Sequence, residues 1–216
     1  MTNKASSTDG IVRFLVRPGD FVTAGDDIAE VHPPAAAPLL APLVERHVDV
    51  GTHRTLDQDI EFAIDQIIEI ALRAMSPAID DTFTGLSCLD WLGAAMRSLA
   101  PLPVERAIWF DSSGSIRVVD PPRQFPGLVT AAFSELRQSA VPGCPSAAMR
   151  ILEVIAGLGP HVTRPQDRVA LCVEADMLML QATRAAWAPK EMTAVTVRYR
   201  AVCEAMEHTP PPELAG

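Results

Sequence analysis

The sequence predicts an α+β protein that is mainly helical, with a small N-terminal β module and one β-hairpin. Three observations predict this class: β-favouring segments with Gly-Asp turns between residues 11 and 31, amphipathic stretches punctuated by proline after residue 55, and a turn-forming Asp111-Ser112-Ser113-Gly114 between two β-favouring runs. Four regions are expected along the chain: a disordered N-terminus (1–10), the β module with its connector (11–42), an α-helical domain with the hairpin near 106–119 (43–208), and a tail (209–216).

The β module is expected to form around two turns whose glycines and aspartates favour tight backbone bends. Its β-favouring segments and turns are, in order, Ile11–Val16, Pro18-Gly19-Asp20, Phe21-Val22, Ala24-Gly25-Asp26-Asp27 and Ile28–Val31. This spacing resembles half of a barrel-sandwich hybrid, such as a biotinyl or lipoyl domain. The lysine that such a carrier modifies does not follow, which argues against a covalent carrier. The segment is therefore interpreted as a folding module.

The stretch from His32 to Pro42 is rich in proline and alanine. Proline lacks the N–H group that a helix needs and clashes with the preceding turn. An extended connector is therefore predicted here, and no regular helix.

Helices are expected from residue 56 onward. Thr55-Leu56-Asp57-Gln58 has the form of a capping box for the first helix, Ser76-Pro77 ends it, and Asp81 can cap the second. The predicted ranges are 56–75, 82–100, 126–140, 146–158, 165–187 and 189–207.

The helix over 56–75 is expected to be central and largely buried. Phe62, Ile68 and Leu72 fall inside the polar arc of this helix, so both of its sides need partners. Ile67 is expected to belong to the core. The polar arc is formed by carboxylates at every fourth position: Asp57, Glu61, Asp65 and Glu69.

A long composite motif runs from Arg54 to Asp90. Its residues are Arg54, Thr55, Gln58, Asp59, Glu61, Phe62, Ser76, Pro77, Asp81, Phe83, Thr84, Cys88, Leu89 and Asp90. This motif resembles the signature R-T-x-x-Q-D-x-E-F, then S-P-x-x-[ND]-D-x-F-T, then C-L-D, in the C-terminal soluble half of a bacterial family of predicted membrane proteins of unknown function, domain-of-unknown-function family 2254. The resemblance also covers the upstream turn Arg17–Val22. This chain departs from the signature at Asp80, Thr82 and Gly85, where the family has Asn, Pro and Ala.

The resemblance implies no reaction. Members of that family typically carry transmembrane segments before the soluble half, whereas no segment of this chain reaches the roughly 18 apolar residues of a membrane span. The resemblance therefore implies a membrane-embedded segment of the same family architecture as a partner. The four scattered cysteines predict reduced thiols and a cytoplasmic location, and the resemblance implies that this location is at the inner membrane, reached through N-terminal segments absent from this chain.

Acidic residues are concentrated around the motif. Between residues 49 and 90, nine carboxylates face two arginines, which gives −7 of the chain's net charge of −9. One interpretation is a solvated helix face, with Glu69 paired to Arg73 and Asp81 serving as a cap. The alternative is a divalent-cation site of hard oxygen ligands. Its candidate ligands are Asp80, Asp81, Glu61, Asp65 and His53.

The remaining chemistry is sparse. There is no P-loop, dinucleotide fingerprint, G-x-S-x-G or H-E-x-x-H, the four cysteines lack metal-ligand spacing, and a pI near 5.0 disfavours nucleic acid. No cofactor is predicted, apart from the divalent cation of the alternative. The leading hypothesis is a soluble, non-catalytic assembly or regulatory domain of a membrane-associated protein. The alternative is a divalent-metal-binding domain or metal-dependent enzyme.

A homo-oligomer is expected as well. A lone β piece has unpaired strand edges, and the positive mean hydropathy of +0.16 suggests that a partner covers some surface. The competing explanation is that the β piece docks on the chain's own helices.

Overall fold

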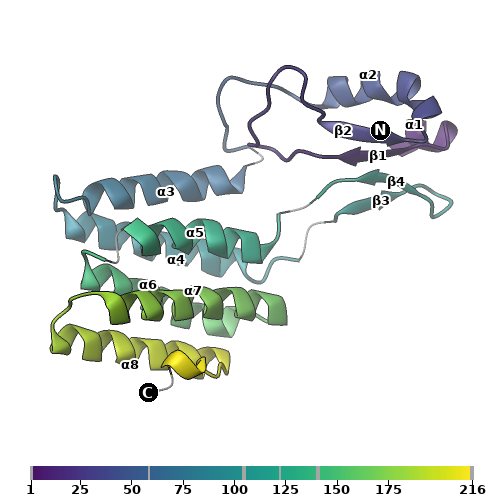
Figure 1. Ribbon diagram of the computed structural model, residues 1–216. Helices are drawn as coiled ribbons and strands as arrows, with labels where there is room; N and C mark the ends of the chain where they lie inside the picture. Colours follow the sequence, from purple (N-terminus) through teal and green to yellow (C-terminus); the bar gives the residue numbers. More distant parts are fainter. Residues whose placement is uncertain (1, 58, 104–105, 122, 140–141, 215–216) are drawn as a thin grey trace. The chain divides into compact units, whose positions relative to one another are not determined.

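The α+β class is confirmed by a computed structural model, which describes residues 2–57, 59–103, 106–121, 123–139 and 142–214 (Figure 1). The chain divides into two compact units. The first unit comprises Met1–Phe62 and Val104–Arg123, and the second comprises Ala63–Pro103 and Gln124–Gly216.

The strands of the first unit form one mixed sheet in the order β2-β1-β4-β3. β1 pairs antiparallel with β2, β3 pairs antiparallel with β4, and the central pair β1 and β4 is parallel, with Val12 opposite Val118. The bounds are Ile11–Phe14 (β1), Ala29–His32 (β2), Ile108–Phe110 (β3) and Ile116–Val119 (β4).

The hairpin therefore belongs to the β module. The sequence predicted it inside the helical domain, but β4 pairs with β1 and extends the N-terminal sheet. Local turn chemistry identifies a hairpin without identifying the edge that it joins. The expected third β-favouring segment, Phe21-Val22, is a loop, and Phe21 is 91% exposed.

Two helices cover this sheet, and both differ from the prediction. The N-terminus, expected to be disordered, contains α1 (Thr2–Ser7), where Ala5 is fully buried. The prediction of an extended connector over His32–Pro42 is also wrong, because residues of this stretch form a 3-10 turn (η1, Pro34–Ala36) and the start of α2 (Ala37–His47).

Proline is tolerated in these two elements for a positional reason. Each element has a proline within its first turn, where no intrahelical N–H bond is required. Only Pro42 lies inside α2, and it costs one hydrogen bond. Leu40 and Val44, four residues apart, bury one face of α2 in the core of the first unit with Ala5, Val12 and Ala36.

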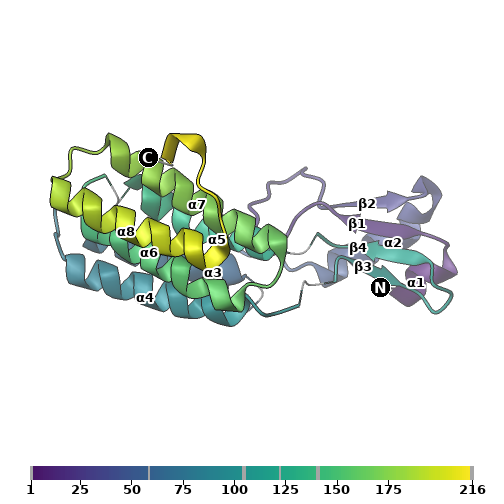
Figure 2. The ribbon, with the colours of Figure 1, turned by 90° about the horizontal axis from the view of Figure 1, so that it is seen from below.

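The second unit consists of two layers of helices. α6 packs between α4 and α8 in one layer, and α5 packs on α7 in the other, where α3 lies at the edge (Figures 1 and 2). The bounds are Ile60–Ala74 (α3, whose first turn counts with the first unit), Thr82–Leu99 (α4), Phe125–Ser139 (α5), Pro145–Leu158 (α6), Pro165–Arg184 (α7) and Pro189–Met206 (α8), with short 3-10 turns at Gly159–His161 (η2) and Pro212–Leu214 (η3). These helices follow the predicted ranges closely, and three of them begin at proline, as helix N-termini allow.

The core of the second unit lies between the two layers. Its largest fully buried side chains include Phe133, Leu152, Ile155 and Leu178. The prediction that α3 is buried on both sides is wrong. Ile64 and Ile68 enter the core, but Ile67 is only half-buried and Ile70 is 54% exposed. The reason is positional, because α3 lies at the edge of its layer and, among the described helices, neighbours cover only one of its faces.

Candidate functional site

The Arg54–Phe62 part of the motif converges on the buried carboxylate of Asp59, which is 2% exposed. Arg54 Nε donates to Asp59 Oδ2 at 2.7 Å, and Arg123 Nη2 lies 3.2 Å from Oδ1. The Phe62 N–H donates to Oδ1 at 3.1 Å, which is the bond an N-cap residue makes. Asp59, and not the predicted Thr55, therefore begins α3. Thr55 is exposed, and Gln58 lies outside the described residues.

Arg123 extends this cluster to the first turn of the β module. Its guanidinium forms an ion pair with Glu61 and donates from Nη2 to the Pro18 carbonyl at 2.5 Å. The neighbouring Gly19 has φ +93°, and a Cβ there would overlap Asp59 Oδ2. We call Gly19, Arg54, Asp59, Glu61 and Arg123 the Asp59 hub. The Arg54 guanidinium also lies 5.0 Å from the centre of the Phe62 ring.

The electrostatics of the hub fix Asp59 in its charged form. Burial alone would raise the pKa of Asp59, but the hydrogen bonds from Arg54 and the Phe62 N–H, with the charges of Arg123 and Arg54, together hold that pKa below its ordinary value. A carboxylate held in this form is a poor general acid or base at neutral pH. The hub is thus arranged to hold the β module's turn, the loop before α3 and Arg123 together.

The second half of the motif forms the junction between α3 and α4. Asp81 Oδ1 accepts from the Thr84 N–H at 3.0 Å, and Oδ2 accepts from the Thr84 hydroxyl at 2.6 Å, which confirms Asp81 as the cap. The Ser76 hydroxyl donates to the Arg73 carbonyl at 2.8 Å in the turn that Pro77 follows. Phe83, in the first turn of α4, is 82% exposed.

The metal candidates do not come together. Among the described residues, no three His, Cys, Asp or Glu side chains are placed to share a metal ion. Asp81 is engaged as a cap, Glu61 is paired with Arg123, and His53 and Asp80 are exposed. Asp65 lines a separate polar groove of the second unit with Glu69 and Glu135. The predicted pair of Glu69 and Arg73 is present at 2.6 Å.

Replacement of Asp81 distinguishes the cap from a ligand. Asp81→Ala should lower the free energy of unfolding of the second unit by about 0.5–2 kcal/mol, because the Thr84 N–H loses its acceptor. The measurement is urea denaturation in metal-free buffer, with Asp80→Ala as the neighbouring control. A variant of unchanged stability that instead loses Mg²⁺ or Ca²⁺ binding would contradict the cap assignment.

The last motif carboxylate, Asp90, begins a line of ion pairs across one helix layer of the second unit. Arg150 Nη1 of α6 lies 2.5 Å from Asp90 Oδ1, and Arg150 Nε is 3.2 Å from Glu153. Glu153 in turn pairs with Arg198 of α8 at 2.6 Å. Of the other two residues of the C-L-D part of the motif, Cys88 is partly buried and lines a groove beside α4, and Leu89 is buried in the core.

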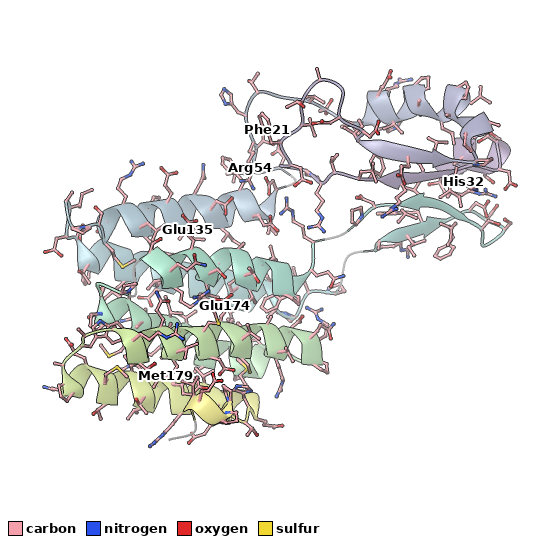
Figure 3. The ribbon with its side chains drawn as sticks, viewed as in Figure 1. Phe21, His32, Arg54, Glu135, Glu174 and Met179 are labelled. Carbon is pink, nitrogen blue, oxygen red and sulfur yellow. The ribbon has the colours of Figure 1, made fainter. Side chains whose placement is uncertain are left out.

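Several polar clusters were missed by sequence reasoning because their members are far apart in the chain. In the first unit, Arg117 is buried between Asp111 (2.7 Å) and Asp9 (2.9 Å). Hydrogen bonds from Ser113 and Arg117 hold the pKa of Asp111 well below its ordinary value. In the second unit, Glu174 on α7 accepts from Ser134 and pairs with Arg137 at 3.1 Å (Figure 3).

A third cluster of this kind ties the end of the chain to α7. The Tyr199 hydroxyl donates to Asp176 at 2.6 Å, and His208 Nε2 lies 3.0 Å from both carboxylate oxygens of Asp176. Burial and the bond to Asp176 raise the pKa of Tyr199, so its proton stays in place. Burial, with the nearby Asp176 and Cys203, raises the pKa of Cys172 to about 11. The thiol is therefore protonated and a poor nucleophile at neutral pH.

An apolar groove on the outer side of α3 and α4 was also missed. It encloses about 530 Å³ and is lined by Ile67, Ile70, Cys88, Trp91, Ala94, Ala95 and Ser98. Trp91 is 72% exposed. The available signal was the composition of α4, whose only charged residues are Asp90 and Arg97. Such a helix is expected to be covered on every side, and here one side is open.

Comparisons with known proteins agree with the motif. The sequence model of a family described as "Predicted membrane protein (DUF2254)" matches residues 1–157. Uncharacterized proteins of Mycobacterium bovis and Mycobacterium tuberculosis are 28% identical over 172 residues, which is 77% of this chain and 33% of each relative. The chain thus spans about a third of the length of these relatives. No solved structure matches it. No helix among the described residues has the length and apolarity that crossing a bilayer requires.

Proposed function

Because the chain belongs to the DUF2254 family of predicted membrane proteins, we propose that it is a non-catalytic assembly domain of a membrane-associated protein. One observation carries this proposal. The bonded polar side chains of the motif region are directed at the chain's own groups, while large apolar side chains of the same region remain at the surface.

The polar half of that observation argues against catalysis. Asp59 and Glu61 are neutralised by Arg123, Asp81 accepts two bonds from Thr84, and Asp90 is paired with Arg150. A general acid or base needs a pKa near the working pH and access to substrate. The pKa of Asp59 and that of Asp81 are both lowered, and Asp59 is buried. These carboxylates have the properties of structural groups.

The apolar half supports assembly. Ile70, Phe83 and Trp91 are 54%, 82% and 72% exposed, and the groove beside Trp91 carries no charged lining residue. Exposed apolar surface such as this groove typically marks a protein interaction site.

The proposed place of action is the cytoplasmic face of the inner membrane. The four cysteines are unpaired, as is usual in a reducing compartment. The net charge of −9 disfavours direct adsorption to anionic lipid. Attachment through a membrane-embedded protein of the same family architecture is therefore the form of association that the proposal requires.

Flotation tests this role. The purified chain should float with membrane vesicles from its source cells at physiological salt, and it should lose most of that association when the vesicles have been stripped of exposed protein by protease. Liposomes made from the extracted lipids are the control and should leave the chain at the bottom of the gradient. Equal flotation with liposomes, or none with native vesicles, would contradict the proposal.

A further inference from the structure

Two opposite faces of helix α4 are apolar. One face, with Leu89, Leu92 and Met96, is buried in the core of the second unit. Gly93 lies on the same side, where a Cβ would be 2.8 Å from Val154 of α6. The opposite face carries Trp91 and Ala94 and is open. α4 lies at the lower edge of the helices in Figure 2, and α3 lies at their upper edge in Figure 1. The open face therefore ends the helix stack, and the apolar end of a helix stack needs a cover.

On the open face, the large Trp91 side chain projects beside a hollow in the surface. Trp91 stands on the side of α4 that faces Ile67 and Ile70 of α3. One turn and two turns further along the same side, Ala95 and Ser98 have small side chains and leave the groove open. A bulky side chain thus lies about 6–10 Å along the helix from a hollow that could receive it, at 1.5 Å per residue.

The other side of α4 carries two opposite charges. Asp90 pairs with Arg150 of α6 but keeps 55% of its side chain exposed. Arg97 is exposed and lies near Gly157 of α6. Among the described residues, no ion pair engages Arg97. Asp90 and Arg97 are seven residues apart, so they share one side of the helix, and Ala94 lies close to the midpoint between them.

From these features we infer that the α3–α4 face binds a second copy of this chain, with the two α4 helices antiparallel about a two-fold axis beside Ala94. This inference rests on the proposed assembly function and names the partner. The two-fold axis lies in the plane of the interface and is perpendicular to α4, so the two helices run in opposite directions. The side of α4 that carries Trp91 then lies opposite the same side of the other copy, and the side that carries Asp90 and Arg97 does likewise. Each Trp91 then enters the hollow at Ala95 and Ser98 of the other copy, and each Asp90 faces the other copy's Arg97.

Area and charge both favour this occupant. α4 is about 27 Å long, and two helices side by side are about 20 Å wide. A face of that size, with the relief of its side chains, is comparable to the roughly 800 Å² that each partner buries in a stable interface. A lipid surface fits poorly, because the lining of the groove has no lysine or arginine to meet anionic headgroups. Small residues at the centre allow close approach of two helices.

Sedimentation equilibrium of the full chain between about 1 and 100 μM tests the inference. The expected mass is twice the 23.2 kDa of one chain. Ala94→Arg should weaken dimerisation at least about 100-fold, since it places two like charges at the axis. Val197→Arg is the matched control, because Val197 is an exposed apolar residue (57%) on α8, and it should leave the mass unchanged. Circular dichroism confirms that both variants are folded.

Complementary charge reversal tests the antiparallel register. Asp90→Arg and Arg97→Asp should each weaken the homodimer at least about tenfold, because each brings like charges together twice. Mixing the two variants should restore a dimer, since every Arg at position 90 or 97 then faces an Asp. No recovery on mixing would overturn the register. A wild-type monomer at all concentrations, or a dimer indifferent to Ala94→Arg, would overturn the inference. A monomer that still floats with native vesicles would overturn only this step and not the proposed function.

Discussion

Asp59→Asn is expected to lower the free energy of unfolding of the first unit by about 2–4 kcal/mol. The substitution keeps the shape of the side chain and removes the charge that Arg54 and Arg123 share. Removing one partner of a buried ion pair leaves the other charge uncompensated, which commonly costs about 3–5 kcal/mol. Solvent access to Arg54, whose side chain is 33% exposed, reduces this loss.

Urea denaturation followed by tryptophan fluorescence measures this effect, because Trp109 is the one tryptophan in the sequence of the first unit. Asp57→Asn is the control, since Asp57 lies two residues away and is exposed. It should change the free energy of unfolding by less than about 0.5 kcal/mol. Equal denaturation midpoints for the two variants would contradict the claim that the Asp59 hub stabilises the first unit.

The acid dependence of the first unit should follow the same carboxylate. A carboxyl with a lowered pKa contributes stability above its unfolded pKa of about 3.9, and that contribution is lost as the pH falls through the folded pKa. The contribution of Asp59 is therefore complete at pH 7 and declines below about pH 4. In Asp59→Asn this part of the acid transition should be absent.

Gly19→Ala is expected to destabilise the first unit by about 3 kcal/mol or more. Gly19 has φ +93°, a region that costs an L-residue about 1–3 kcal/mol. In addition, the new Cβ would overlap Asp59 Oδ2 and lie 3.2 Å from Arg54 Nε, so the central ion pair would have to move.

Gly25→Ala separates these two costs. Gly25 has φ +101°, but a Cβ there has nothing within 4 Å, so only the backbone strain applies. Chemical denaturation should therefore show a loss at position 19 that exceeds the loss at position 25 by about 1–2 kcal/mol. The double variant Gly19→Ala with Asp59→Asn should lose less than the sum of the single losses, because both act on one cluster. Strict additivity would contradict the close approach of Gly19 to Asp59.

Local signals predicted the helices well. Proline at positions 145, 165 and 189 begins three helices where the first turn tolerates it, and Asp81 caps α4 as expected. The same proline rule failed at residues 33–42, because a helix can contain proline when it lies in the first turn or when tertiary packing of residues such as Leu40 offsets one lost bond.

Long-range pairing could not be predicted from one sequence. β1 and β4 are about a hundred residues apart, and no local pattern indicates that they pair. The same holds for Arg123, which joins Asp59 and Pro18 across long stretches of chain. The motif contains Arg54, Asp59 and Glu61, which lie together in the hub around Arg123. It did not show that an arginine outside the motif neutralises the carboxylates, and this difference separates a structural hub from a metal site.

The central claim is that the Asp59 hub holds the fold while the α3–α4 face makes the assembly. Sedimentation equilibrium of Asp59→Asn and Ala94→Arg, side by side under native conditions, tests it most directly. The account predicts that Asp59→Asn keeps the mass of a dimer and that Ala94→Arg has the mass of one chain. A monomeric Asp59→Asn beside a dimeric Ala94→Arg would contradict it, because the Asp59 hub would then be needed for assembly and the α3–α4 face would not.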